Sequence, residues 1–342
     1  MKRLSNFIWP VIALVAMGFS FWLLAKDLKD MSFTDVVASL RAIPVRNYLF
    51  AGLSTLVAYG ALAWYDRIGL MHLGHKFSWP FISLVSFTTY ALSHNIGASM
   101  FTGGVVRYRA YSTKGLNMPE VAFLVAFCSF TFALGTILLG GLVLVFEPQI
   151  ITRMPGDLPL WAGRLAGAAM LASVVLYFVG STMNFKPLNL GKFKLVYPRI
   201  SITLRQMVAA PIELLGAAGI IYFAMPEAGN PGYFIVLGVF LASFSAGLLS
   251  HAPGGLGVLE ATFIHAMPDA PKPDVIAALL MFRFFYLILP LLFSLVVVFI
   301  FERGQMRKAA AAGSSGLAGL KLEAAKLSQE AREIRANKNA AP

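Results

Sequence analysis

The chain has 342 residues, of which 58% are hydrophobic and 13% charged, with a formal net charge of +12. This composition and several long apolar runs exclude a mainly soluble protein and indicate a polytopic membrane protein. The positive charge does not indicate a nucleic-acid partner, because most Lys and Arg residues lie between apolar runs, where they orient helices and contact anionic lipid headgroups.

The chain begins with Lys2 and Arg3, and a first apolar span follows over 7–25. No cleavage site of the A-x-A type comes after it, and Lys26 and Asp27 end the apolar run. We therefore expect a retained membrane helix with a cytoplasmic N-terminus.

The next elements are a short helix and a second span. Ser32 and Asp35 have capping-box spacing, and apolar residues recur at helical spacing up to Ile43, which predicts a helix lying in the membrane interface. The second span covers 47–64. Asp66 follows it, and we expect this residue to be solvated at the end of the helix.

Two stretches combine apolar sequence with a Ser-His pair and glycines. The first runs from Ser93-His94-Asn95-Ile96-Gly97 to Gly103-Gly104, and the second is Ser250-His251-Ala252-Pro253-Gly254-Gly255-Leu256-Gly257. Irregular backbone at membrane depth persists only where it is buried in protein or lines a cavity. Two such breaks therefore predict a substrate site. The glycines expected to form the irregular backbone are Gly97, Gly103, Gly104, Gly254, Gly255 and Gly257.

The remaining membrane spans are predicted from the lengths of the apolar runs and from the charged residues that separate these runs. Full spans are predicted over 120–146, 161–182, 207–225 and 275–301, with a basic linker after the second of these. The only cysteine, Cys128, lies within the first of them and is assigned to packing. We expect no disulfide, no metal site and no cofactor.

The basic residues favour one topology. If every apolar run crossed the membrane, the outer loops would hold more Lys and Arg than the inner loops, against the positive-inside rule. The rule is satisfied if 79–104 is a re-entrant hairpin from the cytoplasm and 233–267 is one from outside. The predicted fold is thus all-α and polytopic, with about six full transmembrane helices and two oppositely oriented re-entrant hairpins that form an inverted repeat.

The membrane-embedded domain is predicted to cover 1–306. Residues 307–342 are predicted to form a cytoplasmic linker and a short, charged helical tail.

Ionisable residues inside the membrane are costly and are candidates for function. Arg107 and Arg109 follow the first break and suit a phosphate headgroup, although both could equally be positive-inside anchors. Glu213 and Glu260 could hold a cationic group, pair with an arginine or pair helices. Further candidates for lipid binding or transport are Asp66, His94, His251, Arg283 and Tyr286, and the two histidines either move protons or hydrogen-bond loose carbonyls.

Three motifs in this order resemble the lysylphosphatidylglycerol synthase transmembrane family, the flippase-domain family of the multiple peptide resistance factor. They are Ser93–Gly97 with Gly103–Arg109 and Tyr111, then Pro253–Glu260, then Arg283–Tyr286 with Pro290. The resemblance covers roughly 7–301. It implies a protein of the bacterial inner membrane that moves a phospholipid between leaflets. The distribution of basic residues predicts a multi-pass protein with cytoplasmic N- and C-termini.

By the same resemblance, Arg107, Glu213 and Glu260 would be polar residues of the lipid path. The best-known members move an aminoacylated phosphatidylglycerol and carry a large synthase domain after the membrane part. Only about forty residues follow Phe301 here, so aminoacyl transfer is not expected of this chain. The lipid then stays open, and a separate lipid-modifying enzyme and a homodimer are the other partners considered.

Two hypotheses follow. The first is a flippase-like carrier in which Arg107 holds the lipid phosphate and the two glutamates hold a cationic group or pair with Arg283. The alternative is a membrane-embedded polyprenyl phosphatase, with Ser93-His94 and Ser250-His251 at the hairpin tips as its reactive residues.

Overall fold

A computed structural model describes residues 32–96, 99–153, 158–183, 188–190, 193–195, 198–227, 229–249 and 255–304. The chain forms two compact units, Met1–Ser294 and Leu295–Pro342, and the features below belong to the first, apart from residues 295–304 at the end of the last apolar helix. The predicted first span over 7–25 and the predicted tail lie outside the described residues, as do His251, Gly97 and Gly254.

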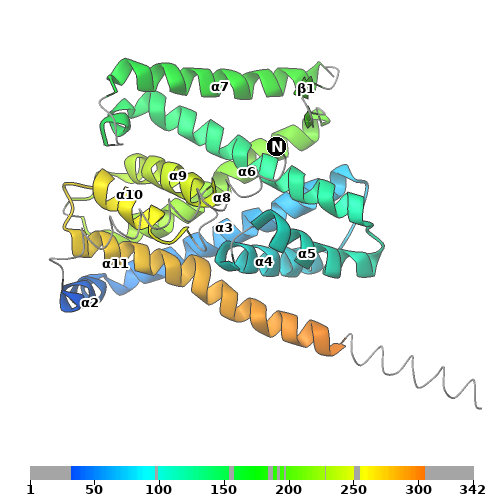
Figure 1. Cartoon of the computed structure of the whole chain (residues 1–342), viewed down its shortest axis with the longest axis horizontal. Helices are drawn as coiled ribbons and strands as arrows, with labels where there is room; N and C mark the ends of the chain where they lie inside the picture. Colours follow the sequence, from blue (N-terminus) through cyan, green and yellow to red (C-terminus); the bar gives the residue numbers. More distant parts are fainter. Residues whose placement is uncertain are drawn as a thin grey trace, which may run out of the picture. The chain divides into compact units, whose positions relative to one another are not determined.

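The described part is helical apart from one short β-hairpin (Figure 1). In chain order its helices are α2 (Phe33–Ala42), α3 (Val45–His72), α4 (Trp79–Ile96), α5 (Ser99–Tyr111), η1 (Ser112–Lys114), α6 (Met118–Phe146), η2 (Pro148–Arg153), α7 (Leu160–Thr182), α8 (Ile200–Ala224), α9 (Tyr233–Leu249), α10 (Val258–Ala266), α11 (Lys272–Phe282) and η4 (Arg283–Ile288). Strands β1 (Leu188–Leu190) and β2 (Phe193–Leu195) pair antiparallel, with Leu188 opposite Leu195.

Five helices of the described part are long and apolar enough to cross a membrane. They cover Val45–His72, Met118–Phe146, Leu160–Thr182, Ile200–Ala224 and Lys272–Gly304. The predicted helical membrane protein is therefore confirmed, and five of the six predicted spans have a counterpart.

Two predicted boundaries are wrong. The second span does not end before Asp66, because α3 continues to His72. The span predicted from 207 begins at Ile200, seven residues earlier. Both predictions placed a helix terminus next to polar residues. In the structure, polar side chains at these positions have partners within the bundle, so the helices continue past them. The predicted short helix is confirmed as α2, with both capping-box hydrogen bonds of Ser32 and Asp35, and its position in the membrane interface stays a prediction.

Small residues allow the long helices to pack closely. A Cβ atom on Gly216 of α8 would lie 2.9 Å from the backbone of α3, at both Ser54 O and Ala58 N. A Cβ on Gly167 of α7 would lie 2.8 Å from the carbonyl oxygen of Gly141 on α6. Such contacts are the usual basis of helix association in membranes, where burial of apolar surface contributes little.

Two pairs of shorter helices form helical hairpins. Arg67, near the end of α3, stacks on Trp79 at the start of α4, and Phe81 in the first turn of α4 contacts Tyr111 at the end of α5. The chain therefore enters and leaves the first hairpin at one end. In the second hairpin, Tyr233 at the start of α9 contacts Tyr222 near the end of α8, and Arg153 binds the carbonyl of Ala266 at the end of α10.

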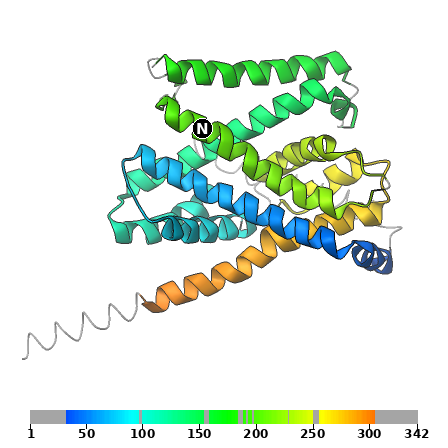
Figure 2. The same ribbon diagram turned by 180° about the vertical axis from the view of Figure 1, so that it is seen from behind.

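The two hairpins occupy different halves of the helical bundle, as seen from the front and from behind (Figures 1 and 2). The order of a long helix, a hairpin and a long helix occurs twice, as α3 to α6 and as α8 to α11 with its continuation. Helices α3 and α8 run antiparallel, because the ring of Phe50 near the start of α3 contacts that of Phe223 near the end of α8.

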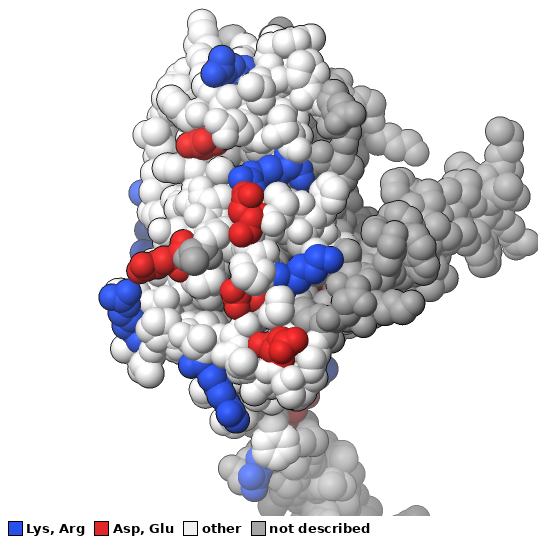
Figure 3. Space-filling model, turned by 90° about the vertical axis from the view of Figure 1, so that its left-hand side faces the viewer, with Lys and Arg blue, Asp and Glu red and all other residues white. Residues whose placement is uncertain are grey.

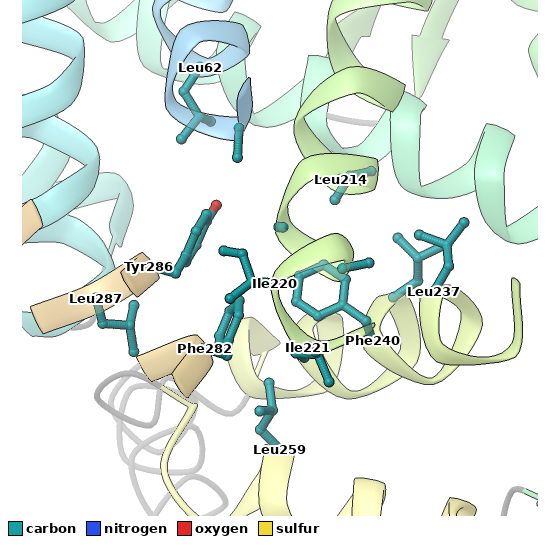
Figure 4. Close-up of a cluster of buried hydrophobic side chains, with 14 of the residues drawn as sticks. Leu62, Leu214, Ile220, Ile221, Leu237, Phe240, Leu259, Phe282, Tyr286 and Leu287 are labelled. Atoms are coloured by element: carbon teal, nitrogen blue, oxygen red, sulfur yellow. The ribbon is translucent and has the colours of Figure 1, made fainter. Parts of the chain in front are cut away.

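The apolar core lies where α3, α8, α9 and α11 meet (Figure 4). Phe240 of α9, Phe282 of α11 and Leu214 of α8 are among its fully buried side chains. Tyr286 of η4 is also buried, and its hydroxyl points away from this core toward α3 and α8. Tyr286 therefore places a polar hydroxyl group at the boundary between this core and the site described next.

Candidate functional site

A cavity of about 150 Å³ lies among α3, α4, α5, α6, α8 and α9, and we call it the polar cavity. It is lined by Leu62, Tyr65, Tyr90, Ser93, His94, Arg107, Val125, Cys128, Ser129, Phe132, Glu213, Phe244 and Leu248. Three residues predicted from the sequence, His94, Arg107 and Glu213, are thus brought together. An arginine, a carboxyl group and an imidazole in one cavity within a membrane bundle meet the description of a functional site.

Arg107 lines the polar cavity and forms an ion pair with Asp66, which is not among the lining residues. Its Nη2 lies 2.7 Å from Oδ1 of Asp66, and its Nε lies 3.2 Å from both carboxylate oxygens. Asp66 is 0% exposed and Arg107 is 3% exposed. The expectation that Asp66 is solvated is therefore wrong, since α3 extends past this residue and its charge is balanced inside the bundle.

Two further donors complete the environment of Asp66. The hydroxyl of Tyr111 donates to Oδ2 at 2.9 Å, and the Cys128 thiol donates to Oδ1 at 3.5 Å. Arg107 also lies over the ring of Tyr90, 4.9 Å from its centroid. Its third guanidinium nitrogen, Nη1, makes no hydrogen bond within the described residues. That N–H group can therefore serve a ligand in the polar cavity.

Gly103 explains how α5 brings Arg107 against α4. A Cβ atom there would lie 3.0 Å from Ser93 Oγ and 3.2 Å from Arg107 Nη1. Gly103 and Gly104 lie inside α5, so the expectation that these two glycines break the helix is wrong. They support close packing of the hairpin instead, because a glycine within a helix removes only the side chain and leaves the backbone hydrogen bonds in place.

Glu213 forms the opposite wall of the polar cavity. Its Oε1 accepts a hydrogen bond from Tyr286 at 2.8 Å, and its Oε2 accepts a longer one from Tyr65 at 3.4 Å. Within the described residues Glu213 forms no ion pair. Two tyrosine hydroxyls therefore orient this buried carboxyl group, and no cation of the described chain competes with a ligand for it.

His94 lines the same polar cavity. Its ring stacks on Tyr286 with 5.4 Å between centroids and meets Phe244 edge-on at 5.9 Å. Its Nδ1 is buried and has no hydrogen-bond partner among the described residues. Buried polar atoms without partners are rare in native structures, so this nitrogen is a candidate ligand contact.

Glu260 and Arg283 form a second ion pair outside the polar cavity. Nε of Arg283 lies 2.6 Å from Oε1 of Glu260, which agrees with the expected alternative that the two residues pair. Oε2 of Glu260 accepts the backbone N–H of Gly257 at 2.9 Å. Gly255 and Gly257 have φ angles of 64° and 81°, so the predicted irregular backbone is present there. This pair joins the second hairpin to the last helix.

The turn that carries Arg283 and Tyr286 is π-helical. In η4 the N–H of Leu289 reaches the carbonyl of Phe284, five residues back. The carbonyl of Tyr286 accepts a hydrogen bond from Tyr59 at 2.9 Å, and that of Leu287 accepts one from Asn95 at 3.1 Å. Side chains from α3 and α4 therefore satisfy groups that this wider turn exposes.

Arg109 does not join the site. It lies on the exposed side of α5, two residues after Arg107, and does not line the polar cavity. The sequence reading missed Tyr65, Tyr90 and Tyr111. Tyr111 could have been found, since it follows Arg107 by four residues and so shares its helix face. Among the described residues no group of three His, Cys, Asp or Glu side chains could hold a metal ion.

Comparisons with known proteins agree with this architecture. The family described as "Lysylphosphatidylglycerol synthase TM region" matches residues 11–294. The inner membrane protein YbhN of Escherichia coli is 32% identical over 72% of this chain and 77% of its own length. The uncharacterized protein slr0712 of Synechocystis is 28% identical over 78% of this chain and 83% of its own length.

Longer relatives match only in part. The phosphatidylglycerol lysyltransferases of Staphylococcus haemolyticus and Staphylococcus aureus are each 23% identical, and the matches cover 27% and 32% of their lengths. The fold and the polar cavity define a multi-pass helical membrane protein with ionisable groups inside its bundle. This chain belongs to the lysylphosphatidylglycerol synthase TM region family.

Proposed function

We propose that this protein carries a phospholipid between the two leaflets of the bacterial inner membrane. The observation that carries the proposal is the polar cavity, which is lined by Arg107 and Glu213 inside the membrane-spanning bundle. Membership of the family supports it, as do a relative named as an inner membrane protein and relatives named for a phosphatidylglycerol reaction.

The two walls of the polar cavity, formed by Arg107 and Glu213, suit the two ends of a lipid headgroup. A guanidinium N–H binds a phosphate oxygen through a charge-assisted hydrogen bond, and a carboxylate suits a cationic group such as a lysyl amine. Arg107 and Glu213 would take these roles, and His94 lines the same cavity. A cavity of about 150 Å³ is smaller than the roughly 300–1,000 Å³ of most ligand sites, so transport requires the cavity to widen.

The repeated order of elements supports alternating access to this cavity. In this proposal each helical hairpin is re-entrant, one from each face of the membrane, and the two halves form an inverted repeat. Such repeats in transporters place the site near the bilayer midplane at the interface between the halves. The polar cavity fits this arrangement, because it is lined by residues of α3, α4, α5 and α6 from one half and of α8 and α9 from the other.

The distribution of charge supports an orientation with cytoplasmic termini. The end of the bundle where α3 and α7 finish and α6 and α8 begin carries the exposed basic residues Arg67, Lys76, Arg109, Lys114 and Arg199. The opposite end carries both signs, including the pairs Arg46–Glu227 and Arg153–Asp269. Figure 3 shows acidic and basic side chains intermingled on the left-hand face of Figure 1. The basic end would be cytoplasmic.

The phosphatase alternative draws on the same cavity. Ser93 and His94 both line it, but the Ser93 hydroxyl donates to the carbonyl of Thr89 at 2.6 Å, so it is engaged with its own helix. Release of inorganic phosphate from a polyprenyl diphosphate by the purified protein would favour this alternative over the carrier.

Leaflet exchange of fluorescent phosphatidylglycerol and of its lysyl derivative tests the carrier. Vesicles with purified protein are treated with dithionite, which bleaches only lipid in the outer leaflet. We expect bleaching beyond the outer-leaflet fraction for at least one lipid. Glu213→Gln and the double variant Asp66→Asn/Arg107→Gln should slow it tenfold or more, since they retain polar side chains but remove the charges of the cavity.

The matched control is Arg46→Gln, which removes an exposed charge outside the polar cavity and should exchange lipid as the wild type does. Exchange no faster than in empty vesicles for both lipids would reject the carrier. Wild-type rates in both cavity variants would remove the polar cavity from the mechanism.

A further inference from the structure

A second cavity, of about 310 Å³, lies between α6, η2, α7 and α9, and we call it the apolar cavity. It is lined by Thr136, Gly140, Val143, Leu144, Ile150, Ile151, Met170, Gly238, Leu241, Ala242 and Ser245. No charged side chain is among these residues, and the Thr136 hydroxyl donates to the carbonyl of Phe132 in its own helix. The lining therefore offers almost no hydrogen bond to a polar ligand.

The apolar cavity continues the polar cavity along the same pair of helices. Phe132 of α6 and Phe244 of α9 both line the polar cavity, and their ring centroids are 6.1 Å apart. Thr136 lies one helical turn beyond Phe132, and Leu241 lies about one turn before Phe244. Because α6 and α9 run antiparallel here, both steps lead in the same direction, from the polar cavity into the apolar one.

Two glycines let side chains pack closely at the wall of the apolar cavity. A Cβ atom on Gly238 would collide with Ile150, and one on Gly140 would lie 2.9 Å from the terminal methyl of Met170. Ala242 is exposed, so the cavity reaches the surface of the bundle. Its volume falls at the lower end of the roughly 300–1,000 Å³ found for ligand sites.

We infer that the apolar cavity binds an acyl chain of the phospholipid whose headgroup occupies the polar cavity. The inference rests on the proposed function, and it assigns residues of α6, α7 and α9 to the lipid tail. An acyl chain fits because it needs no hydrogen bonds and because it is tethered to a headgroup at the other side of the Phe132–Phe244 pair. The aromatic pair then separates headgroup from tail.

Photo-crosslinking tests the acyl site directly. Vesicles with the full-length protein receive phosphatidylglycerol carrying a diazirine on one acyl chain, and crosslinked peptides are mapped by mass spectrometry. We expect crosslinks at α6 and α9 within the apolar cavity, beyond those on the exposed side of α7. Ala242→Phe should reduce the cavity crosslinks at least fivefold, since the new ring fills the space.

The matched control is Ala172→Phe, the same substitution at an exposed position of α7 that does not line the apolar cavity. It should leave the cavity crosslinks unchanged. A diacylglycerol with the same diazirine chain has no phosphate and should crosslink there much less. Equal crosslinking by both lipids would overturn the coupling of tail to headgroup, and an absence of cavity crosslinks would overturn the acyl site.

The same variants separate this inference from the carrier function. Cavity crosslinks without leaflet exchange would support the acyl site and reject the carrier. Exchange that Ala242→Phe leaves at the wild-type rate, with no cavity crosslinks, would support the carrier and overturn the acyl site. If the wild type gives no cavity crosslinks, the inference is wrong whatever Ala242→Phe does to the melting temperature.

Discussion

At the residue scale, Asp66 and Arg107 depend on each other. An ion pair this deeply buried is expensive to desolvate, and the cost is offset only while both charges and their hydrogen bonds are present. Tyr111 and Cys128 supply the additional donors to Asp66. The pair therefore positions Nη1 of Arg107 at the polar cavity, but it makes single substitutions of either residue hazardous for folding.

We predict that Asp66→Ala lowers the free energy of unfolding by about 3–5 kcal/mol, because it leaves the Arg107 charge buried without a partner. The double variant Asp66→Asn/Arg107→Gln should recover a large part of that loss. Denaturation of the purified protein in detergent measures both. Arg46→Gln breaks a pair that is 70% and 98% exposed and should cost at most about 1 kcal/mol. A loss from Asp66→Ala no larger than this would contradict the prediction.

The two tyrosines on Glu213 give a second prediction. Tyr286→Phe removes the donor at 2.8 Å and should cost about 1–3 kcal/mol, because a buried carboxyl oxygen is left unsatisfied. Tyr65→Phe removes a bond of 3.4 Å and should cost less. Thermal unfolding of the two variants under identical conditions compares them, and the reverse order would show that Tyr65 holds Glu213.

Part of this site could be predicted from the sequence. Charged residues in apolar runs are conspicuous, so Arg107 and Glu213 were among the candidates, and both line the polar cavity. The partner of Arg107 was not found, because Asp66 is 41 residues away in the chain. Asp66 is also followed by Arg67, and two adjacent charged residues suggest the end of a helix. Asp66 is enclosed by side chains that are distant in the sequence, namely Arg107 and Tyr111 of α5 and Cys128 of α6.

At the scale of elements, the first hairpin depends on one glycine more than on its neighbour. Gly103 faces α4, where a methyl group would meet Ser93 and Arg107, whereas a Cβ on Gly104 would lie 3.8 Å from Val125, an ordinary contact. Substitutions at these two positions therefore distinguish a loss of packing between helices from the general effect of replacing a glycine within a helix.

We predict that Gly103→Ala destabilises the protein by about 1–3 kcal/mol through overpacking of α4 against α5. Gly104→Ala should change stability by about 0.5 kcal/mol or less. Melting temperatures in detergent and leaflet-exchange rates provide the comparison, with Gly104→Ala as the control. Equal behaviour of the two variants would mean that α4 and α5 are not held at this distance.

Hydropathy predicts the long helices well, because the bilayer demands long apolar runs whatever their neighbours are. It predicts the hairpins less well. Gly103 and Gly104 suggested a break that the structure does not have, since a glycine in a sequence signals either a turn or a close helix contact. The re-entrant insertion of the hairpins stays a prediction.

At the scale of the whole molecule, the proposed orientation can be tested with introduced cysteines. Glu227→Cys and Lys114→Cys lie at opposite ends of the bundle, and both positions are exposed. A membrane-impermeant maleimide applied to intact spheroplasts should label Glu227→Cys, while Lys114→Cys should react only after permeabilisation. The native Cys128 is buried and gives the background. The opposite labelling pattern would invert the proposed topology.

The π-helical turn η4 also constrains the length of the last membrane helix. A π turn amounts to an α-helix that has gained one residue, and here it lets Arg283 reach Glu260 while Tyr286 reaches Glu213. Excising one residue would restore the α-helix but turn one of these side chains by about 100° around the axis. Many substitutions on the lipid-facing side of the last membrane helix should be tolerated. An insertion or deletion of a single codon in η4 would instead break the contacts of Glu213 and Glu260 at once.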